Sequence, residues 1–350
     1  MPSVFAEVSM AKKKISIKDI ATTLGISITT VSFILNGKAR EKRISEELTK
    51  KVTEYIKEVN YQPSHLAQSL RSGKSKVLVL MVEDISNYFF AAIARLIEEK
   101  AYKNGYKIIY CSTENKPEKA AELINTFKVR NVDGFIITPT PKLEPSIQQL
   151  IDEEYPVILF DRWIPEIRCS YVIVENKKSA FDGTTHLIKN HCKNIALITL
   201  TSEQSQMEDR KNGYLEAMAM YGLDPHVYEL PYHHFVNQAA AENIQKYIES
   251  RPELDGLFFS TNYLAFEGLK AIGNLGIEIP GKLAIVSFDD HYFFSLYRPQ
   301  ITAIAQPIEE LAQSLINGIL QQLEEPENKN ITAKILDTQL CVRQSSFLKT

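Results

Sequence analysis

The side chains of this sequence with the clearest chemistry are cations gathered near its N-terminus. Residues 1–76 contain 14 Lys and Arg against 7 Asp and Glu, a net charge of +7, whereas the rest of the chain contains 26 against 36, a net charge of −10. A basic N-terminal segment on an otherwise acidic chain indicates that this segment alone binds a polyanion such as nucleic acid. An ordinary solvated surface is the alternative as long as no motif accompanies the charge.

Patterns for catalysis or metal binding do not accompany these cations. The sequence has no H-E-x-x-H motif of zinc proteases and no G-x-S-x-G motif of serine hydrolases. Arg71–Ser75 resembles the end of a phosphate-binding loop, but Gln68 occupies the position where such a loop has its first glycine. The cysteines are Cys111, Cys169, Cys192 and Cys341. Their scatter, without a C-x-x-C pair or a histidine at ligand spacing, favours reduced thiols in a cytosolic protein. We therefore expect no enzyme, no cofactor and no metal site.

Residues 15–60 have the pattern of three short helices. Ser16 can cap a first helix that ends at Gly25, where glycine tolerates the positive φ of a tight turn. Ser27 can cap a second helix that runs to about Asn36, and Ser45 can cap a third. Two short helices around a glycine turn, followed by a third, predict a helix-turn-helix domain.

The segments on either side of this domain are of a different kind. Residues 1–14 are a predicted tail without the apolar stretch of a signal peptide, and Met10 is an alternative start to Met1. Residues 61–75 combine a short helix, begun by Pro63, with a linker, and a helix of that length is unstable alone in water. Nowhere do about 18 apolar residues run together, so we expect no membrane span and a cytoplasmic protein.

Residues 76–345 alternate apolar runs with segments of helical period. The runs that predict strands are Val77–Val82, Tyr106–Cys111, Gly134–Ile137, Val157–Phe160, Tyr171–Val174, Asn194–Leu200, Gly256–Ser260 and Leu283–Ser287. We expect each run to be followed by a helical segment, which is typical of parallel, doubly wound α/β sheets. Strands near residues 171–174 and 301–305 fall where two such sheets could be cross-connected.

Short motifs are spread in order along the whole chain. In the first part they are Ile17–Ala21, Gly25–Ser27, Thr30–Ser32, Leu35–Gly37, Asn60–Pro63 and Ala67–Arg71, and further on Asp84–Asn87, Val132–Gly134, Phe160–Arg162, Arg210–Tyr214, Ser287–Asp290 and Gln306–Pro307. Together they resemble the LacI/GalR (lac repressor) family of bacterial transcription regulators. The resemblance implies an all-α helix-turn-helix head, a hinge helix, and an effector-binding and dimerisation domain of two periplasmic-binding-protein-like subdomains. It also implies a homodimer that binds a double-stranded DNA operator.

The second helix of the head is expected to enter a major groove of the operator. For the hinge, the resemblance implies that Leu70 wedges into the minor groove, with a core contact to the sensor as the alternative. Phe33 could pack on thymine methyl groups or against the third helix, and the sequence leaves both open. The candidate DNA contacts are Ser27, Ile28, Thr29, Thr30, Ser32, Phe33 and Asn36 in the head, and His65, Leu66, Gln68, Ser69 and Leu70 in the hinge.

In the second domain, the resemblance places a small effector in a cleft between the subdomains. The candidate contacts are Phe89, Phe90, Asp161, Trp163, Arg210, Asn262 and Asp289. Arg offers a rigid fork of donors, and Asp and Asn supply acceptors and an amide, a mixture that suits the hydroxyls of a sugar. A structural ion pair is the alternative for each charged member. Control by a protein partner in place of a sugar, and a plain solute-binding protein, are the alternative functions.

Overall fold

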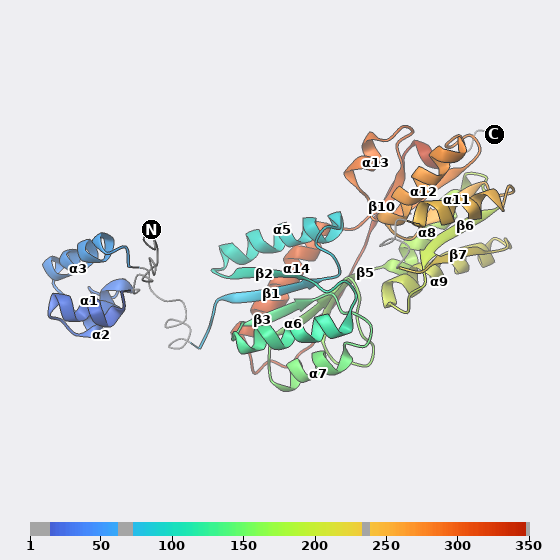
Figure 1. Cartoon of the computed structure of the whole chain (residues 1–350). Helices are drawn as coiled ribbons and strands as arrows, with labels where there is room; N and C mark the ends of the chain where they lie inside the picture. The colour runs from blue at the N-terminus through green and yellow to red at the C-terminus, as the bar shows by residue number, and fades with distance from the viewer. Residues whose placement is uncertain (1–14, 62–72, 233–238, 348–350) are drawn as a thin grey trace, which may run out of the picture. The chain divides into compact units, whose positions relative to one another are not determined.

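A computed structural model of the chain describes residues 15–61, 73–232 and 239–347 (Figure 1). The chain divides into two compact units, Met1–Ser75 and Lys76–Thr350. We call the first unit the head and the second the sensor. The head is helical, and the sensor is built on two β-sheets.

The described residues of the head, 15–61, form three helices, and the sequence explains where each begins. They are α1 (Ile17–Leu24), α2 (Ile28–Leu35) and α3 (Glu46–Glu58). The hydroxyls of Ser16, Ser27 and Ser45 each accept a hydrogen bond from the backbone N–H three residues later. These bonds satisfy N–H groups that have no partner within a helix. The three predicted caps are confirmed.

Turns and a small apolar core hold the three helices together. Gly25 follows α1 with φ 66°, a left-handed conformation that costs glycine little. α2 ends at Leu35, one residue before the predicted end at Asn36, and Gly37 follows with φ 69°. The core consists of Ile20, Ala21, Val31, Ile34 and Val52. Only two residues of α2 are buried, so the opposite side of this helix can face a partner.

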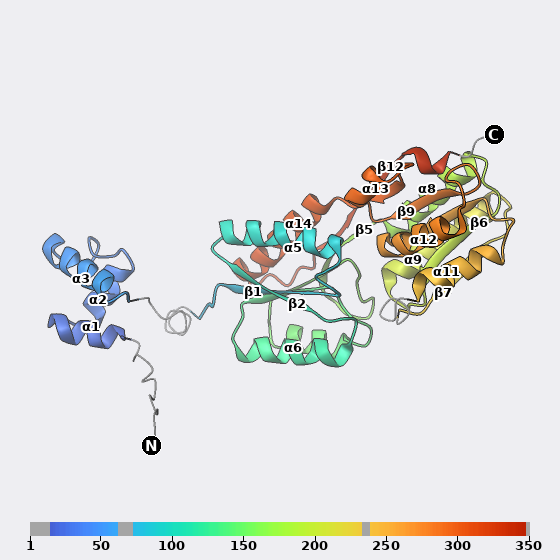
Figure 2. The same ribbon diagram turned by 45° about the horizontal axis from the view of Figure 1, so that its top comes forward.

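The first sheet of the sensor has six parallel strands. In spatial order they are β11 (Ala333–Leu336), β5 (Ser170–Val174), β4 (Val157–Phe160), β3 (Gly134–Ile137), β1 (Val77–Val82) and β2 (Lys107–Ser112). Its helices are α5 (Tyr88–Lys103), α6 (Pro117–Val129), α7 (Glu144–Asp152) and α14 (Ile308–Glu324). Figures 1 and 2 show α5 and α14 on one face of the sheet and α6 on the other.

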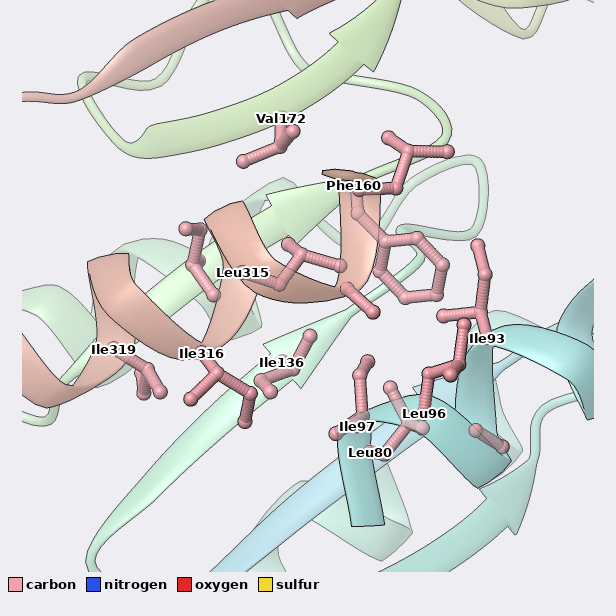
Figure 3. Packing of buried hydrophobic residues seen from close by; sticks show 14 of the residues in the cluster. Leu80, Ile93, Leu96, Ile97, Ile136, Phe160, Val172, Leu315, Ile316 and Ile319 are labelled. Carbon is pink, nitrogen blue, oxygen red and sulfur yellow. The ribbon is translucent and has the colours of Figure 1, made fainter. Parts of the chain in front are cut away.

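Apolar layers cover both faces of this sheet. On one face, Ile93 and Ile97 of α5 and Leu315 of α14 pack with Leu80 and Ile136 of the strands (Figure 3). On the other face, a second cluster joins the strands to α6 and α7. Because both faces are buried, β3 and β4 are apolar at every position instead of alternating.

The second sheet of the sensor also has six strands. In spatial order they are β12 (Gln339–Cys341), β10 (Thr302–Ala305), β9 (Ala284–Phe288), β8 (Gly256–Phe259), β6 (Ile195–Leu200) and β7 (His226–Leu230). Its helices are α8 (Asn176–Lys189), α9 (Ser205–Met220), α11 (Ala240–Glu249), α12 (Asn262–Leu275) and α13 (Tyr292–Leu296). One apolar cluster joins α11, α12 and α13 to the sheet, and another joins α8 and α9 to it. We call the two sheets with their helices the N-terminal and C-terminal subdomains.

The predicted two-sheet fold is confirmed, and the eight predicted strands are found with ends shifted by at most one residue. Two details differ. β4 is not followed by a helix, because a loop of residues 161–169 leads directly to the parallel strand β5. β12 runs antiparallel to β10, so the second sheet is not fully parallel. The edge strands β7, β11 and β12 were not predicted, since they are short and largely half-exposed.

The chain passes between the two sheets three times. The crossovers lie between β5 and α8, between β10 and α14, and between β11 and β12. The first two are those predicted near residues 171–174 and 301–305. The third follows from β11 and β12, whose two-residue connection joins an edge of one sheet to an edge of the other.

No single helix in the part of the chain that the structure describes is long and apolar enough to cross a membrane. α1 and α2 meet the length and composition test only when they are taken together, and the pair is bent by 112°. Both helices contribute residues to the core of the head.

Candidate functional sites

The side of α2 that faces away from the core carries the predicted DNA contacts of the head. Ile28 is 46% exposed, and Ser27, Thr29 and Asn36 are exposed beside it. The remaining candidates on this helix are half-buried. The predicted contacts of the hinge are His65, Leu66, Gln68, Ser69 and Leu70, and these lie outside the described residues. The structure therefore brings the seven head candidates onto one helix and its caps.

Several polar groups on this side are already engaged within the helix. Ser27 Oγ lies 2.8 Å from Thr30 Oγ1 and accepts from the Thr30 N–H at 3.0 Å. Asn36 Nδ2 donates to the Ser32 carbonyl at 2.5 Å and approaches Ser32 Oγ at 3.3 Å. These bonds hold the hydroxyls and the amide close to the backbone of α2.

Phe33 has a cation as its neighbour. Lys42 Nζ lies 5.5 Å from the centroid of the Phe33 ring, a distance typical of a cation–π contact. Phe33 is not among the residues that pack against the described core of the head. Lys42 belongs to the loop between α2 and α3, which also carries Lys38, Arg40 and Arg43. The approach of Phe33 to thymine stays a prediction.

In the sensor, two predicted aspartates follow strands of different sheets. Asp161 follows β4 with φ 68°, and Asp289 follows β9 with φ 65°. Such a backbone costs about 1–3 kcal/mol, so the surrounding contacts must hold both residues in place. Burial raises the pKa of Asp161; the charges of Arg162 and Arg210 oppose this rise, and those of Asp289 and Glu83 add to it. The two aspartates therefore share one electrostatic neighbourhood.

Arg210, in α9, joins three segments of the C-terminal subdomain. Its Nε donates to Asn176 Oδ1 at 2.9 Å, and its Nη1 donates to the Ser260 carbonyl at 2.7 Å and to Asp289 Oδ2 at 3.4 Å. Its guanidinium carbon lies 3.6 Å from the centroid of the Phe288 ring. Arg210 is only 2% exposed. Among the described residues its Nη2 group has no acceptor, so this group is available to a ligand.

Arg162 differs from Arg210, because each of its three nitrogens donates a hydrogen bond to a side chain. Its Nη2 donates to Glu83 Oε2 at 2.6 Å, its Nε to Asp161 Oδ2 at 3.2 Å and its Nη1 to Asn115 Oδ1 at 3.0 Å. Arg162 is 3% exposed. A buried guanidinium with these three acceptors orients Asp161.

Two polar contacts join the subdomains beside these residues. Asn115 Oδ1 also accepts from Gln204 Nε2 at 3.1 Å, and the Trp163 backbone N–H donates to Ser205 Oγ at 3.2 Å. Asn115 and Trp163 belong to loops after β2 and β4, whereas Gln204 and Ser205 begin α9. The Trp163 ring stacks on Tyr171, with centroids 5.2 Å apart. The subdomains are thus linked by hydrogen bonds on either side of Arg162.

The other sensor candidates differ in how they are placed. Phe90 packs in the apolar core, with its ring centroid 6.2 Å from that of Phe160. Phe89 lines, together with Asp289, a groove of about 350 Å³. Asn262 is the first residue of α12 and is 3% exposed. Their contact with an effector stays a prediction.

Several polar residues around Arg162 and Arg210 are not among the candidates from the sequence. Asn115 and Asn176 make the bonds given above, and Gln306 Nε2 donates to Asp289 Oδ1 at 2.6 Å. Ser260 Oγ and Gln206 Oε1 are buried without a hydrogen-bond partner among the residues that the structure describes. A ligand hydroxyl or a water satisfies such groups. Most of these residues lie a few positions after the end of a strand. Because open α/β sheets bind ligands beyond the carboxyl ends of their strands, this position is the signal by which the sequence could have identified them.

A helix-turn-helix head and a two-sheet sensor with polar side chains at its strand ends define a class of protein, the DNA-binding regulator with a periplasmic-binding-protein-like sensor. Residues 16–64 match the bacterial regulatory proteins of the lacI family, and residues 184–346 match the periplasmic binding protein-like domain. The ribose operon repressor of Halalkalibacterium halodurans is 31% identical over 331 residues, which cover 95% of this chain and 97% of that protein. The chain belongs to the lacI family of bacterial regulatory proteins.

Further comparisons agree with this family. The HTH-type transcriptional regulator KdgR of Bacillus subtilis is 30% identical over 331 residues, which cover 92% of this chain and 96% of that protein. The lac repressor dimer bound to operator shares the fold, with a TM-score of 0.83 at 18% identity over 96% of this chain and 100% of the other. A LacI-family regulator from Enterococcus faecium with bound ribose has a TM-score of 0.69 at 25% identity and covers 78% of this chain and 100% of its own.

Proposed function

We propose that this protein binds a DNA operator as a homodimer and that a small effector in the sensor cleft controls its affinity for DNA. One observation carries the effector site. Arg210 and Asp289 pair at the strand ends of the C-terminal subdomain, and Asp161 of the N-terminal subdomain lies within their electrostatic reach. Effector occupancy would change the closure of the subdomains, and with it the spacing of the two hinge helices of the dimer.

The charges of this site favour an uncharged effector rich in hydroxyl groups. Among the described residues, the carboxyl groups of Glu83, Asp161 and Asp289 pair with two guanidinium groups, those of Arg162 and Arg210. A phosphate or carboxylate on the effector would add to this negative excess, whereas sugar hydroxyls can donate to the carboxylates and accept from Arg210 Nη2. The names of several relatives fit this class, since they include ribose operon repressors and a ribose-bound regulator.

Thermal stability tests this site, because a ligand that binds only the folded state stabilises it by mass action. The panel contains D-ribose, cellobiose and D-ribose 5-phosphate, each added to the full chain. A sugar present at 100 times its Kd stabilises the protein by about 2.7 kcal/mol, which raises the Tm clearly. We expect a neutral sugar to raise the Tm and its phosphorylated form to do so less. A phosphorylated sugar that stabilises more strongly would contradict the assignment of an uncharged effector.

Paired variants then separate binding from folding. Arg210→Ala and Asp289→Ala should each weaken binding of the stabilising sugar about ten- to a hundred-fold, since each loses a charge-assisted bond of about 1.5–3 kcal/mol. Lys211→Ala is the matched control, because Lys211 follows Arg210 in α9 and pairs with Glu229 at 2.7 Å. Binding is titrated through the fluorescence of Trp163, the one tryptophan of the sequence. Variants that keep full affinity but unfold at lower temperature would show that the pair is structural.

An exposed apolar surface on the C-terminal subdomain supports the proposed dimer. Tyr292, Phe293 and Leu296 of α13 are each more than half exposed. Phe293 and Leu296 line a groove of about 600 Å³ together with Phe266 and Leu269 of α12. Apolar patches of this kind mark protein interfaces. Phe293→Asp should shift the protein from dimer to monomer in sedimentation, and an unchanged mass would exclude this surface from the interface.

Two alternatives predict different results in the same experiments. A sensor controlled by a protein partner would show no saturable response to any small ligand in the panel. A plain solute-binding protein would bind a sugar but would not shift duplex DNA in a gel. We propose no catalytic activity, and this agrees with the relatives, whose names describe repressors and regulators.

A further inference from the structure

α2 lacks the side chains that commonly read guanine and adenine in a major groove. Guanine is read in two-bond contacts by Arg or Lys, and adenine by Asn or Gln. Residues 28–35 of α2 include none of these four types. Asn36, which follows the helix, donates its amide to the backbone and approaches the hydroxyl of Ser32. A helix of this composition must recognise bases in another way.

The first turn of α2 exposes an aliphatic side chain. The hydroxyls of Ser27 and Thr30 contact each other, and Ser27 also caps the helix. Ile28 is 46% exposed at the first position of the helix, and Thr29 is exposed next to it. Residues at the N-terminal end of a recognition helix are the ones that reach base edges. The apolar group on a major-groove base edge is the thymine C5-methyl, so this is the group that an isoleucine can recognise.

The charge of the loop that follows α2 favours DNA as the occupant of this surface. The loop Lys38–Arg43 carries four cations and one acid. Glu41, the acid, pairs with Lys42 at 3.0 Å, and Lys42 also lies over the ring of Phe33. A loop of net positive charge at one end of α2 and an exposed aliphatic side chain at the other suit a groove whose rims are phosphates and whose floor carries methyl groups.

We propose that this protein reads its operator through thymine methyl groups, with Ile28 as the residue that contacts them. Each half-site then contains a thymine opposite the first turn of α2. The inference rests on the proposed DNA-binding function and adds the chemistry of the base contact.

Deoxyuridine substitution tests the methyl group directly. The full chain first selects its operator from a pool of random duplexes at fixed salt, and each thymine of the selected duplex is then replaced in turn by deoxyuridine. Deoxyuridine keeps the pairing edge and the O4 acceptor and lacks only the methyl group. At one position of each half-site, we expect the substitution to raise the Kd about fourfold. This factor corresponds to about 0.8 kcal/mol, the contribution of one buried methyl group. Substitution in both half-sites should raise it about 15-fold.

Two variants assign the effect to one side chain. Ile28→Ala should bind the thymine and deoxyuridine duplexes equally well, and it should remain folded because Ile28 lies outside the core. Ile15→Ala is the matched control, since Ile15 is 39% exposed in the same head but lies outside α2. This control should keep the fourfold difference.

The outcomes distinguish this inference from the function on which it rests. If the selected duplex binds specifically and no deoxyuridine substitution weakens it, the methyl contact is refuted while operator binding stands. If Ile28→Ala keeps the difference between thymine and deoxyuridine, another residue reads the methyl group and the assignment of Ile28 is refuted. If no sequence is enriched from the pool, operator binding itself is refuted, and the inference is refuted with it.

Discussion

Gly213 permits the close packing of α8 and α9 that brings Arg210 to Asn176. A Cβ atom at residue 213 would lie 2.1 Å from the Lys177 carbonyl oxygen and 2.9 Å from the backbone nitrogen of Phe181. Both obstacles are backbone atoms of α8, so rotation of a side chain does not relieve them. Replacing Gly213 by Ala therefore forces the two helices apart by about 1 Å to reach an ordinary contact distance.

This displacement gives the magnitude of the expected loss. Overpacking of a buried contact costs about 1–3 kcal/mol. The same shift would lengthen the bond from Arg210 Nε to Asn176 Oδ1, now 2.9 Å, beyond hydrogen-bond range. A hydrogen bond to a charged group contributes about 1.5–3 kcal/mol, so we expect a total loss of about 2.5–6 kcal/mol. At about 2–4 °C per kcal/mol for a domain of this size, that lowers the Tm by roughly 5–24 °C.

Thermal unfolding of Gly213→Ala and Gly273→Ala in the full chain provides the assay. Gly273 lies inside α12 with no atom within 4 Å of a built Cβ, so Ala there should leave the Tm unchanged or raise it by virtue of its helix propensity. Titration of each variant with the stabilising sugar measures the effect on the site. If Gly213→Ala unfolds at the same temperature as Gly273→Ala, the two helices adjust without cost and the reasoning is wrong.

Other predictions concern DNA binding, closure and pH. The affinity of the full chain for duplex DNA should fall steeply between 50 and 200 mM salt, as expected for a basic head that neutralises phosphates; an affinity independent of salt would contradict this. Leu70→Ala should weaken operator binding far more than binding to random DNA, and equal losses in gel shifts would exclude a minor-groove wedge. Asn115→Ala should lower the Tm, because Arg162 loses an acceptor at a cost of about 1–3 kcal/mol, and should weaken sugar binding by loosening the contact between subdomains; an unchanged Tm would argue against this role. Burial lowers the pKa of His291 below its usual 6.5 although Asp290 opposes this, so stability is present above pH 6.5 and is lost as the pH falls through the lowered pKa. His291→Phe should therefore show a smaller fall in Tm between pH 7.5 and 5.5 than the unchanged protein, and an equal fall would exclude His291 as its source.

Local signals made the helices of the head and the central strands predictable. Ser16, Ser27 and Ser45 cap helices through bonds to residues three positions away, so the whole interaction lies within a short stretch of sequence. Strands such as β3 and β4 are buried on both faces and are therefore apolar throughout. β11 carries neither signal. Three of its four residues are at least partly exposed, and its partner β5 lies more than 150 residues earlier in the chain.

The polar site could be predicted only in part, for a related reason. Arg210 and Asp289 belong to motifs that the sequence displays, but their pairing depends on how α9 and β9 pack. Asn115 has no motif, and its role appears only when loops of two subdomains meet at Gln204. The left-handed backbone of Asp161 likewise depends on the fold, because aspartate tolerates that conformation better than most residues but adopts it in only a minority of cases.

The proposed effector site and the crossovers between the subdomains share hydrogen bonds, which would connect effector binding directly to closure of the subdomains. Asn176, which accepts from Arg210, is the first residue after the crossover from β5, and Gln306, which donates to Asp289, lies in the crossover from β10. A ligand that bonds to Arg210 and Asp289, as proposed, would therefore act on two of the segments that connect the subdomains. Allosteric coupling of about 1–3 kcal/mol is typical. One charge-assisted bond that forms in only one of the two closure states contributes about 1.5–3 kcal/mol, so a single such difference is sufficient to drive the change.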